Sequence, residues 1–156
     1  MSEILSGFLL ELQEIPYNKI TISSICRRIN IARKSFYRHF RSKQDCLLAV
    51  IDDHLVFSYK EAEQGGIQQY FWYWSQHRDF LRRLKVNDLY PILVEQAVKF
   101  VYQSNPESND AYRIRFIVTG VFYVILHWVD KGCRETPAYL EDTLRQFLTI
   151  PFIELS

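Results

Sequence analysis

The sequence predicts an all-α protein. Apolar residues recur at helical spacing near the N-terminus, and only five glycines and five prolines interrupt the 156 residues. A second apolar segment, from Ile114 to Val129, falls short of the roughly 20 apolar residues that span a bilayer, so we expect a buried helix there. An apolar content of 48% can form a real core and excludes a disordered chain.

Three short helices are expected in the first 40 residues. Pro16 ends the first, and Thr21 is a suitable N-cap for the second. Asn30 follows the second helix and tolerates the left-handed backbone conformation of a tight turn. Phe36 and Phe40 are expected to hold the third helix against the other two. The predicted helices cover about residues 2–14, 22–29 and 33–39.

The rest of the chain also has helical patterns. Ser42 is a good N-cap for a long fourth helix, and Gly65 and Gly66 end it. Pro137 suits the first turn of the last helix. The predicted helices cover about residues 43–63, 67–76, 78–86, 88–104, 110–131 and 136–149, with a loop at 105–109. We expect two domains, at residues 1–47 and 48–156.

Charge is unevenly distributed along the chain. Residues 15–44 contain no acidic side chain and eight basic ones. Residues 1–47 hold eight Lys or Arg and four acidic residues, a formal +4, whereas residues 48–156 hold eleven and fourteen, a formal −3. The total of +1 therefore hides a basic end, and an unopposed basic helix-turn-helix predicts contact with the phosphate backbone of DNA.

No enzyme motif is present in the sequence. There is no HExxH, glycine-rich phosphate loop or nucleophile elbow, and the four histidines are scattered without metal spacing. Cys26, Cys46 and Cys133 also follow no metal spacing, so they are expected to be reduced thiols of a cytoplasmic protein. We expect no catalytic activity, no metal, no cofactor and no membrane partner.

The stretch from Ile20 to Leu47 resembles the DNA-binding domain of TetR-type transcriptional regulators. The similarity is strongest in the segment Ser-Phe-Tyr-Arg-His-Phe at 35–40, with Ser42 and Lys43 following at the expected distance. Residues 71–84 and 120–132 resemble the regulatory domain of a TetR subgroup that includes the co-activator of the dihydroxyacetone kinase operon. The resemblance implies a symmetric dimer, held by a bundle of the last two helices of each subunit, that places its third helix in the major groove of an operator. A ligand in the C-terminal domain usually releases DNA, so the implied function is most often repression.

The resemblance also implies roles for single residues. The first turn of the third helix reads base edges, here with Arg33, Lys34 and Ser35. The implied phosphate contacts are Thr21, Tyr37, Arg38, His39 and Lys43. Arg27 and Arg28 are expected to give general attraction. The sequence departs from the family at Ala32, where a Ser or Thr normally caps the third helix.

The helix predicted at 110–131 is apolar nearly all round, so it must be covered on all sides, and dimerisation is the economical explanation. We assign one stripe, with part of the last helix, to the dimer interface: Ile117, Val121, Val124, Trp128, Leu144, Phe147 and Leu148. The opposite assignment, with Phe116, Gly120, Tyr123 and His127 at the interface, stays open.

An aromatic cluster could line a ligand pocket or form plain core. The candidate pocket residues are Phe71, Trp74, Tyr90, Phe116, Tyr123 and His127. An alternative function is a co-activator whose C-terminal domain binds a protein partner. An exposed aromatic patch at 70–74 favours that alternative, whereas a closed cavity favours a small-molecule effector.

Overall fold

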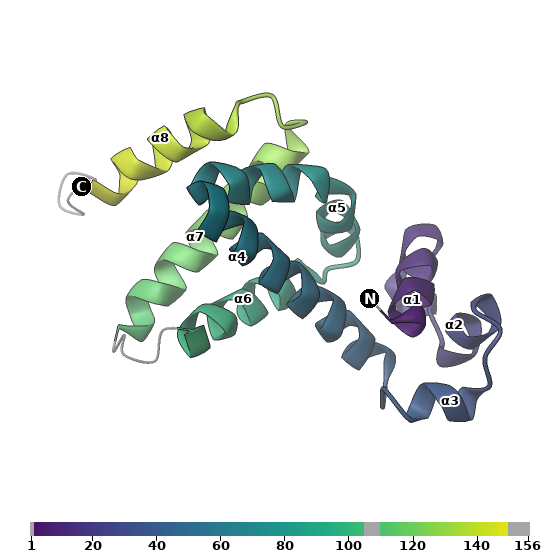
Figure 1. The fold of residues 1–156 in the computed structure, drawn as a ribbon. Helices are drawn as coiled ribbons and strands as arrows, with labels where there is room; N and C mark the ends of the chain where they lie inside the picture. The colour runs from purple at the N-terminus through teal and green to yellow at the C-terminus, as the bar shows by residue number, and fades with distance from the viewer. Residues whose placement is uncertain (1, 105–109, 150–156) are drawn as a thin grey trace.

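The computed structural model describes residues 2–104 and 110–149, with side chains up to residue 146, and every regular element in these ranges is helical (Figure 1). The prediction of an all-α fold is confirmed. The elements are α1 (Glu3–Glu14), the 3-10 turn η1 (Tyr17–Lys19), α2 (Ile22–Arg28), α3 (Arg33–Tyr37), α4 (Lys43–Gln76), α5 (Arg78–Val86), α6 (Tyr90–Ser104), α7 (Ala111–Asp130) and α8 (Pro137–Thr149). We call α1–α3 the head and α4–α8 the body.

The predicted helix boundaries in the head are largely confirmed. The Thr21 hydroxyl accepts a hydrogen bond from the Ser24 amide at 3.0 Å, while the Ser24 hydroxyl accepts one from the Thr21 amide at 3.1 Å, which closes a capping box on α2. Asn30 has φ 55°, in the left-handed region that the turn was expected to need. No side chain caps α3, as the presence of Ala32 at that position predicts.

Helix α4 connects the two parts of the molecule and changes direction near its middle. Ser42 caps its start, and the helix then continues for 34 residues with non-helical backbone angles at Gly65 and Gly66. Gly66 has φ 70° and ψ −163°, a combination that a residue with a Cβ atom avoids. The predicted helix end at these glycines is therefore a kink. The expected domain boundary at 47/48 falls inside the first half of this shared helix.

The body packs α6 and α5 against α7, and α8 against α4 (Figure 1). Helix α6 begins at Tyr90, two residues later than predicted. The Leu89 amide donates to the Leu84 carbonyl at 2.7 Å and Asp88 has φ 57°, so Asp88 belongs to the turn that ends α5.

Helix α7 is long and apolar enough to cross a membrane by length and composition alone. In this fold, however, Phe122, Ile125 and Val129 on one side of it are buried against the rest of the body. The other side of α7 is exposed, so the expectation of a buried helix holds for one side only.

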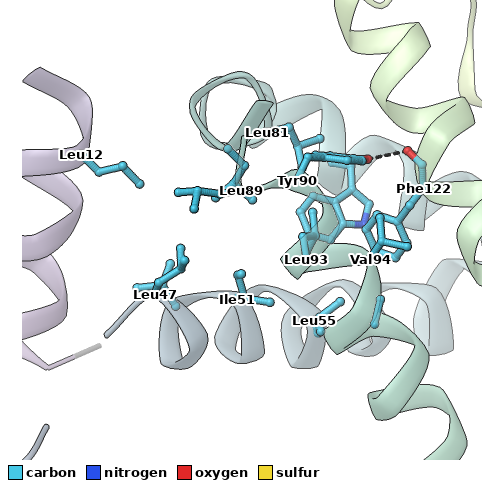
Figure 2. Packing of buried hydrophobic residues seen from close by; sticks show 14 of the residues in the cluster. Leu12, Leu47, Ile51, Leu55, Leu81, Leu89, Tyr90, Leu93, Val94 and Phe122 are labelled. Carbon is cyan, nitrogen blue, oxygen red and sulfur yellow. Dashed lines mark hydrogen bonds between the residues drawn. The ribbon is translucent and has the colours of Figure 1, made fainter. Parts of the chain in front are cut away.

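One apolar core runs through both parts of the protein. Figure 2 shows Leu12 of α1 facing Leu47 and Leu89, with Leu81 and Leu93 farther into the body. The head therefore does not fold over a separate core, and its position depends on contacts with α4 and with the α5–α6 turn.

Candidate functional site

The second and third helices form a fixed helix-turn-helix. The Phe36 side chain is completely buried, and its ring packs on Phe40 with the ring centroids 6.0 Å apart. The Ile31 amide donates to the Cys26 carbonyl at 3.0 Å, which closes the turn between the helices. These contacts hold α3 firmly, and they leave its opposite side to solvent.

The predicted base-reading residues lie together at the start of α3. Arg33 and Lys34 are exposed, whereas Ser35 is half-buried. An Arg33 guanidinium nitrogen lies 3.5 Å from the Tyr37 hydroxyl, one helical turn away. Neither cation forms an ion pair in the described part of the chain. The first turn of α3 therefore presents two uncompensated charges.

The predicted phosphate contacts fall into two groups. Tyr37, Arg38 and His39 are exposed at the end of α3, beside the base-reading turn. Thr21 is also exposed, and its hydroxyl accepts a hydrogen bond while keeping its own proton to donate. These four side chains are accessible to an anion.

Lys43 belongs to the second group, because its ammonium is already engaged. Its Nζ donates to the carbonyl oxygens of Tyr17 at 2.8 Å and Ile20 at 2.9 Å, and it lies 4.5 Å from the centre of the Tyr17 ring. Two of its three protons are thus used to fasten the loop before α2 to the start of α4. The phosphate contact at Lys43 stays a prediction, with one ammonium proton left to donate.

Arg28 also differs from its expected role of general attraction. Its guanidinium pairs with Glu11, at 2.5 Å, and with Glu14. Burial raises the pKa of Glu11, but hydrogen bonds from Ser24 and Arg28 outweigh it and bring that pKa below its ordinary value. These two ion pairs tie α1 to α2, so Arg28 has a structural role, whereas Arg27 forms no ion pair with a described carboxylate.

The body contains an apolar cavity of about 260 Å³ at the kink of α4. Tyr59 and Ala62 line it from the half of α4 before the kink, and Gly66, Ile67 and Tyr70 from the half after it. The remaining walls come from α6 and α7: Val101, Ile117, Val118, Val121 and Phe122. The cavity therefore touches both halves of the helix that leads to the head.

None of the six predicted pocket residues lines this cavity. Phe71, Trp74 and Tyr90 are buried in the core, and the Tyr90 hydroxyl donates to the Phe122 carbonyl at 2.5 Å (Figure 2). Phe116, Tyr123 and His127, by contrast, are exposed on α7. Their helical spacing gives them a common face, but that face points out of the protomer. The two glycines between the predicted helices 43–63 and 67–76 were the sequence signal near this cavity.

The predicted interface stripe also lies elsewhere in the protomer. Ile117 and Val121 line the cavity, and Val124 and Leu144 are half-buried. Trp128 is only 3% exposed, and its indole nitrogen donates to the Glu135 carbonyl at 3.0 Å. The side chains of Phe147 and Leu148 lie outside the described residues.

The apolar surface of α7 is instead formed by the alternative stripe. Phe116 is 60% exposed and Tyr123 is 49% exposed, and Tyr139 of α8 is also exposed. Two of the predicted pocket residues, Phe116 and Tyr123, line a groove of about 480 Å³ on this surface. Arg115 and Glu95 also line it and are paired at 2.6 Å. The stripe assignment that was left open therefore agrees better with the exposed surface than the assignment first preferred.

Comparisons with known proteins agree with this arrangement. Residues 4–50 match the family described as "Bacterial regulatory proteins, tetR family", and residues 61–149 match "Transcriptional regulator C-terminal region". No curated protein sequence matches the chain. Among solved structures, the fold is similar to that of "Dihydroxyacetone kinase operon activator DhaS", with 15% identity, a TM-score of 0.59, and coverage of 94% of this chain and 92% of that chain. The chain belongs to the TetR family of transcriptional regulators.

Proposed function

We propose that the protein is a dimeric repressor that binds operator DNA through α3 and releases it when a small molecule enters the body. The observation that carries this proposal is the cationic first turn of α3, where Arg33 and Lys34 are exposed without an acidic partner in the described residues. Tyr37 at the end of α3 and His39 just after it suit phosphate oxygens. A DNA-binding role also implies a cytoplasmic protein.

The effector in this proposal is compact, apolar and uncharged. The cavity at the α4 kink is below the range of about 300–1,000 Å³ that is usual for drug-sized ligands. Its lining contains no charged side chain, and Tyr59 and Tyr70 supply the only side-chain polar atoms among the residues that line it. A charged molecule would lose its hydration there without a compensating partner.

Dimerisation through α7 and α8 completes the proposed function. Phe116 and Tyr123 form an exposed apolar surface on α7, and α8 also carries an exposed aromatic residue, Tyr139. In a symmetric dimer, such a surface packs against the same surface of the second subunit. A dimer would also place two α3 helices on two half-sites of one operator.

A second candidate function is a co-activator that binds a protein partner. Trp72 of α4 is 48% exposed, and the similar solved structure carries the word "activator" in its name. Aromatic residues of this kind are enriched at protein interfaces. This candidate predicts a stable complex with a partner protein and no release of DNA by small apolar molecules.

Selection of genomic DNA fragments by the purified protein at near-physiological salt tests the main proposal. We expect an enriched pseudo-palindrome whose half-sites lie one helical turn apart, or a multiple of that distance. The Arg33→Ala and Lys34→Ala double variant should lose the enrichment, whereas Arg113→Ala, an exposed arginine on α7, should retain it. Absence of any enriched sequence with the wild-type protein contradicts the proposal.

A further inference from the structure

A second cavity, of about 550 Å³, lies between α1 of the head and α5 of the body. Leu9 and Leu12 line it from α1, and Phe80, Arg82, Arg83 and Val86 line it from α5. It shares no lining residue with the cavity at the α4 kink. Any molecule bound in it would touch the head and the body at once.

The apolar part of this cleft is built partly of fixed side chains. Leu12 is buried, and the Phe80 ring stacks on the His54 ring of α4 with the centroids 4.3 Å apart. Val86, in contrast, is 78% exposed at the end of α5. Covering an exposed valine with another apolar group is favourable, because it removes apolar surface from water.

The charged part of the cleft is positive. Arg82 is held in place by the Val129 carbonyl, at 3.1 Å, and by Asp79, at 3.6 Å. Arg83 is exposed and forms no ion pair with any described carboxylate. Two arginines and one aspartate leave a net charge of +1 among the lining residues.

The acidic residues of the facing helix do not neutralise this charge. Glu11 and Glu14 of α1 are both paired with Arg28 of α2. The only other acidic residue of α1 is Glu3, which lies in the first turn of the helix, away from the lining residues Leu9 and Leu12 in sequence. The guanidinium of Arg83 is therefore available to an external anion.

We propose that the cleft between α1 and α5 binds a small amphipathic monocarboxylate. Its carboxylate pairs with the Arg83 guanidinium, whose planar fork matches two carboxylate oxygens. Its apolar chain lies along Leu9, Phe80 and Val86. A single negative charge matches the net +1 of the lining residues, and the open cleft accepts a flexible chain. The smaller cavity at the kink offers no partner for a carboxylate, so it would exclude this ligand.

Occupancy of this cleft should hold the head in one position. A hydrogen bond from the Tyr17 amide to the Asn87 side-chain oxygen, at 2.6 Å, already ties the head to the turn after α5, next to Val86. A ligand that contacts α1 and α5 adds a further tie between the head and the body. Any effect of this ligand on operator binding rests on the proposed function. Binding of the carboxylate in the cleft, and its effect on the position of the head, do not.

Calorimetric titration of the full chain with octanoate tests the site, with 1-octanol as the uncharged probe of similar length. We expect octanoate to bind, and Arg83→Gln to weaken its binding at least about tenfold, because a charge-assisted pair is lost. The control Arg113→Gln removes an exposed arginine from α7 and should leave octanoate affinity unchanged. 1-Octanol affinity should be the same in the wild type and in Arg83→Gln.

Hydrogen exchange gives a second readout that a merely structural role of Arg83 would not produce. Saturating octanoate should slow exchange of the amides in η1 and at the α5–α6 turn in the wild type, but not in Arg83→Gln. No octanoate binding, or equal affinity in Arg83→Gln and Arg113→Gln, overturns this inference. If operator selection succeeds at the same time, the proposed function stands without the second site.

Discussion

The head and the body carry their functional chemistry in opposite places. The head has a core of completely buried residues such as Phe36, and it exposes cations on α3. The body pairs several of its surface charges, as in Arg115 with Glu95, and has a partly open apolar cavity at the kink of α4. A rigid core with an exposed charged face suits recognition of a rigid polyanion, whereas an incompletely filled core suits a small apolar ligand. The two regions therefore respond differently to substitution.

The largest expected effect is loss of the head core. Phe36→Ala removes a fully buried ring and should lower the free energy of unfolding by about 3–5 kcal/mol. Chemical denaturation measures this loss, and operator binding should disappear with it. Phe57→Ala, at a 54% exposed position of α4, is the control and should stay within about 0.5 kcal/mol of the wild type. A small effect at Phe36 would mean that the head is not a tightly packed unit.

Dimerisation should depend on the exposed stripe of α7 and not on the stripe that faces the core. Phe116→Glu places a charge on that surface and should weaken the dimer by about 2–3 kcal/mol, because a buried unpaired charge is costly. Sedimentation velocity over a concentration series measures the change. Val86→Glu, a charge at an exposed position of α5, should leave the dimer intact. A dimer that survives Phe116→Glu contradicts the proposed interface.

Acid should weaken the body through a buried histidine. His54 lies at 2.8 Å from the Tyr73 hydroxyl and 4.8 Å from the His77 ring, measured between centroids. Burial, and then the neighbouring His77, lower the pKa of His54 from 6.5 to about 3.

Because the pKa of His54 is lower in the folded than in the unfolded protein, its contribution to stability is complete above pH 6.5 and is lost as the pH falls toward 3. The slope is about 1.4 kcal/mol per pH unit, so about 2 kcal/mol should be lost at pH 5. Chemical denaturation at pH 7.5 and at pH 5 measures this loss of unfolding free energy. His54→Gln should flatten the pH dependence, whereas the exposed His39→Gln should not. Equal slopes in the two variants would assign the acid sensitivity to other groups.

Within the head, base-reading and phosphate-binding residues should separate. Lys34→Ala should cost about 1–3 kcal/mol on the preferred operator and change the ranking of operators. Tyr37→Phe should weaken binding evenly across sequences, because a phosphate contact carries no base information. Fluorescence anisotropy with a panel of operator variants measures both. Even losses in both variants would remove the distinction between the two groups of residues.

Local features of this fold were predictable from the sequence, and contacts between distant helices were not. The caps at Thr21 and Ser42 and the turn at Asn30 depend on neighbouring residues, so the pattern predicted them. Lys43 reaches the carbonyl of Tyr17, 26 residues away, and no pattern encodes that approach. The face of α7 was also undetermined, because a helix that is apolar all round has no distinctive side.

The cavity at the kink of α4 also depends on contacts between distant helices. Gly65 and Gly66 predicted an interruption of the helix, and they mark a kink in α4. That interruption alone does not predict that Ile117 and Val121, some 50 residues later, leave space beside it. Cavities result from imperfect packing between elements, so the sequence of one element cannot predict them.

The smallest expected effect concerns the missing N-terminal cap of α3. No side chain caps this helix, since Ala32 stands at its N-cap with an extended backbone, φ −72° and ψ 144°. Ala32→Ser keeps that backbone and adds an acceptor for an amide of the first turn, which should raise stability by about 0.5–1 kcal/mol. Ala111→Ser provides a matched control, because residue 111 is exposed on α7 but follows an N-cap, Asp110, that already accepts the Arg113 amide. Denaturation measures stability, and anisotropy measures operator affinity. A gain in stability with unchanged affinity would mean that α3 is already positioned by Phe36, whereas a gain in both would mean that fraying of its first turn limits DNA binding.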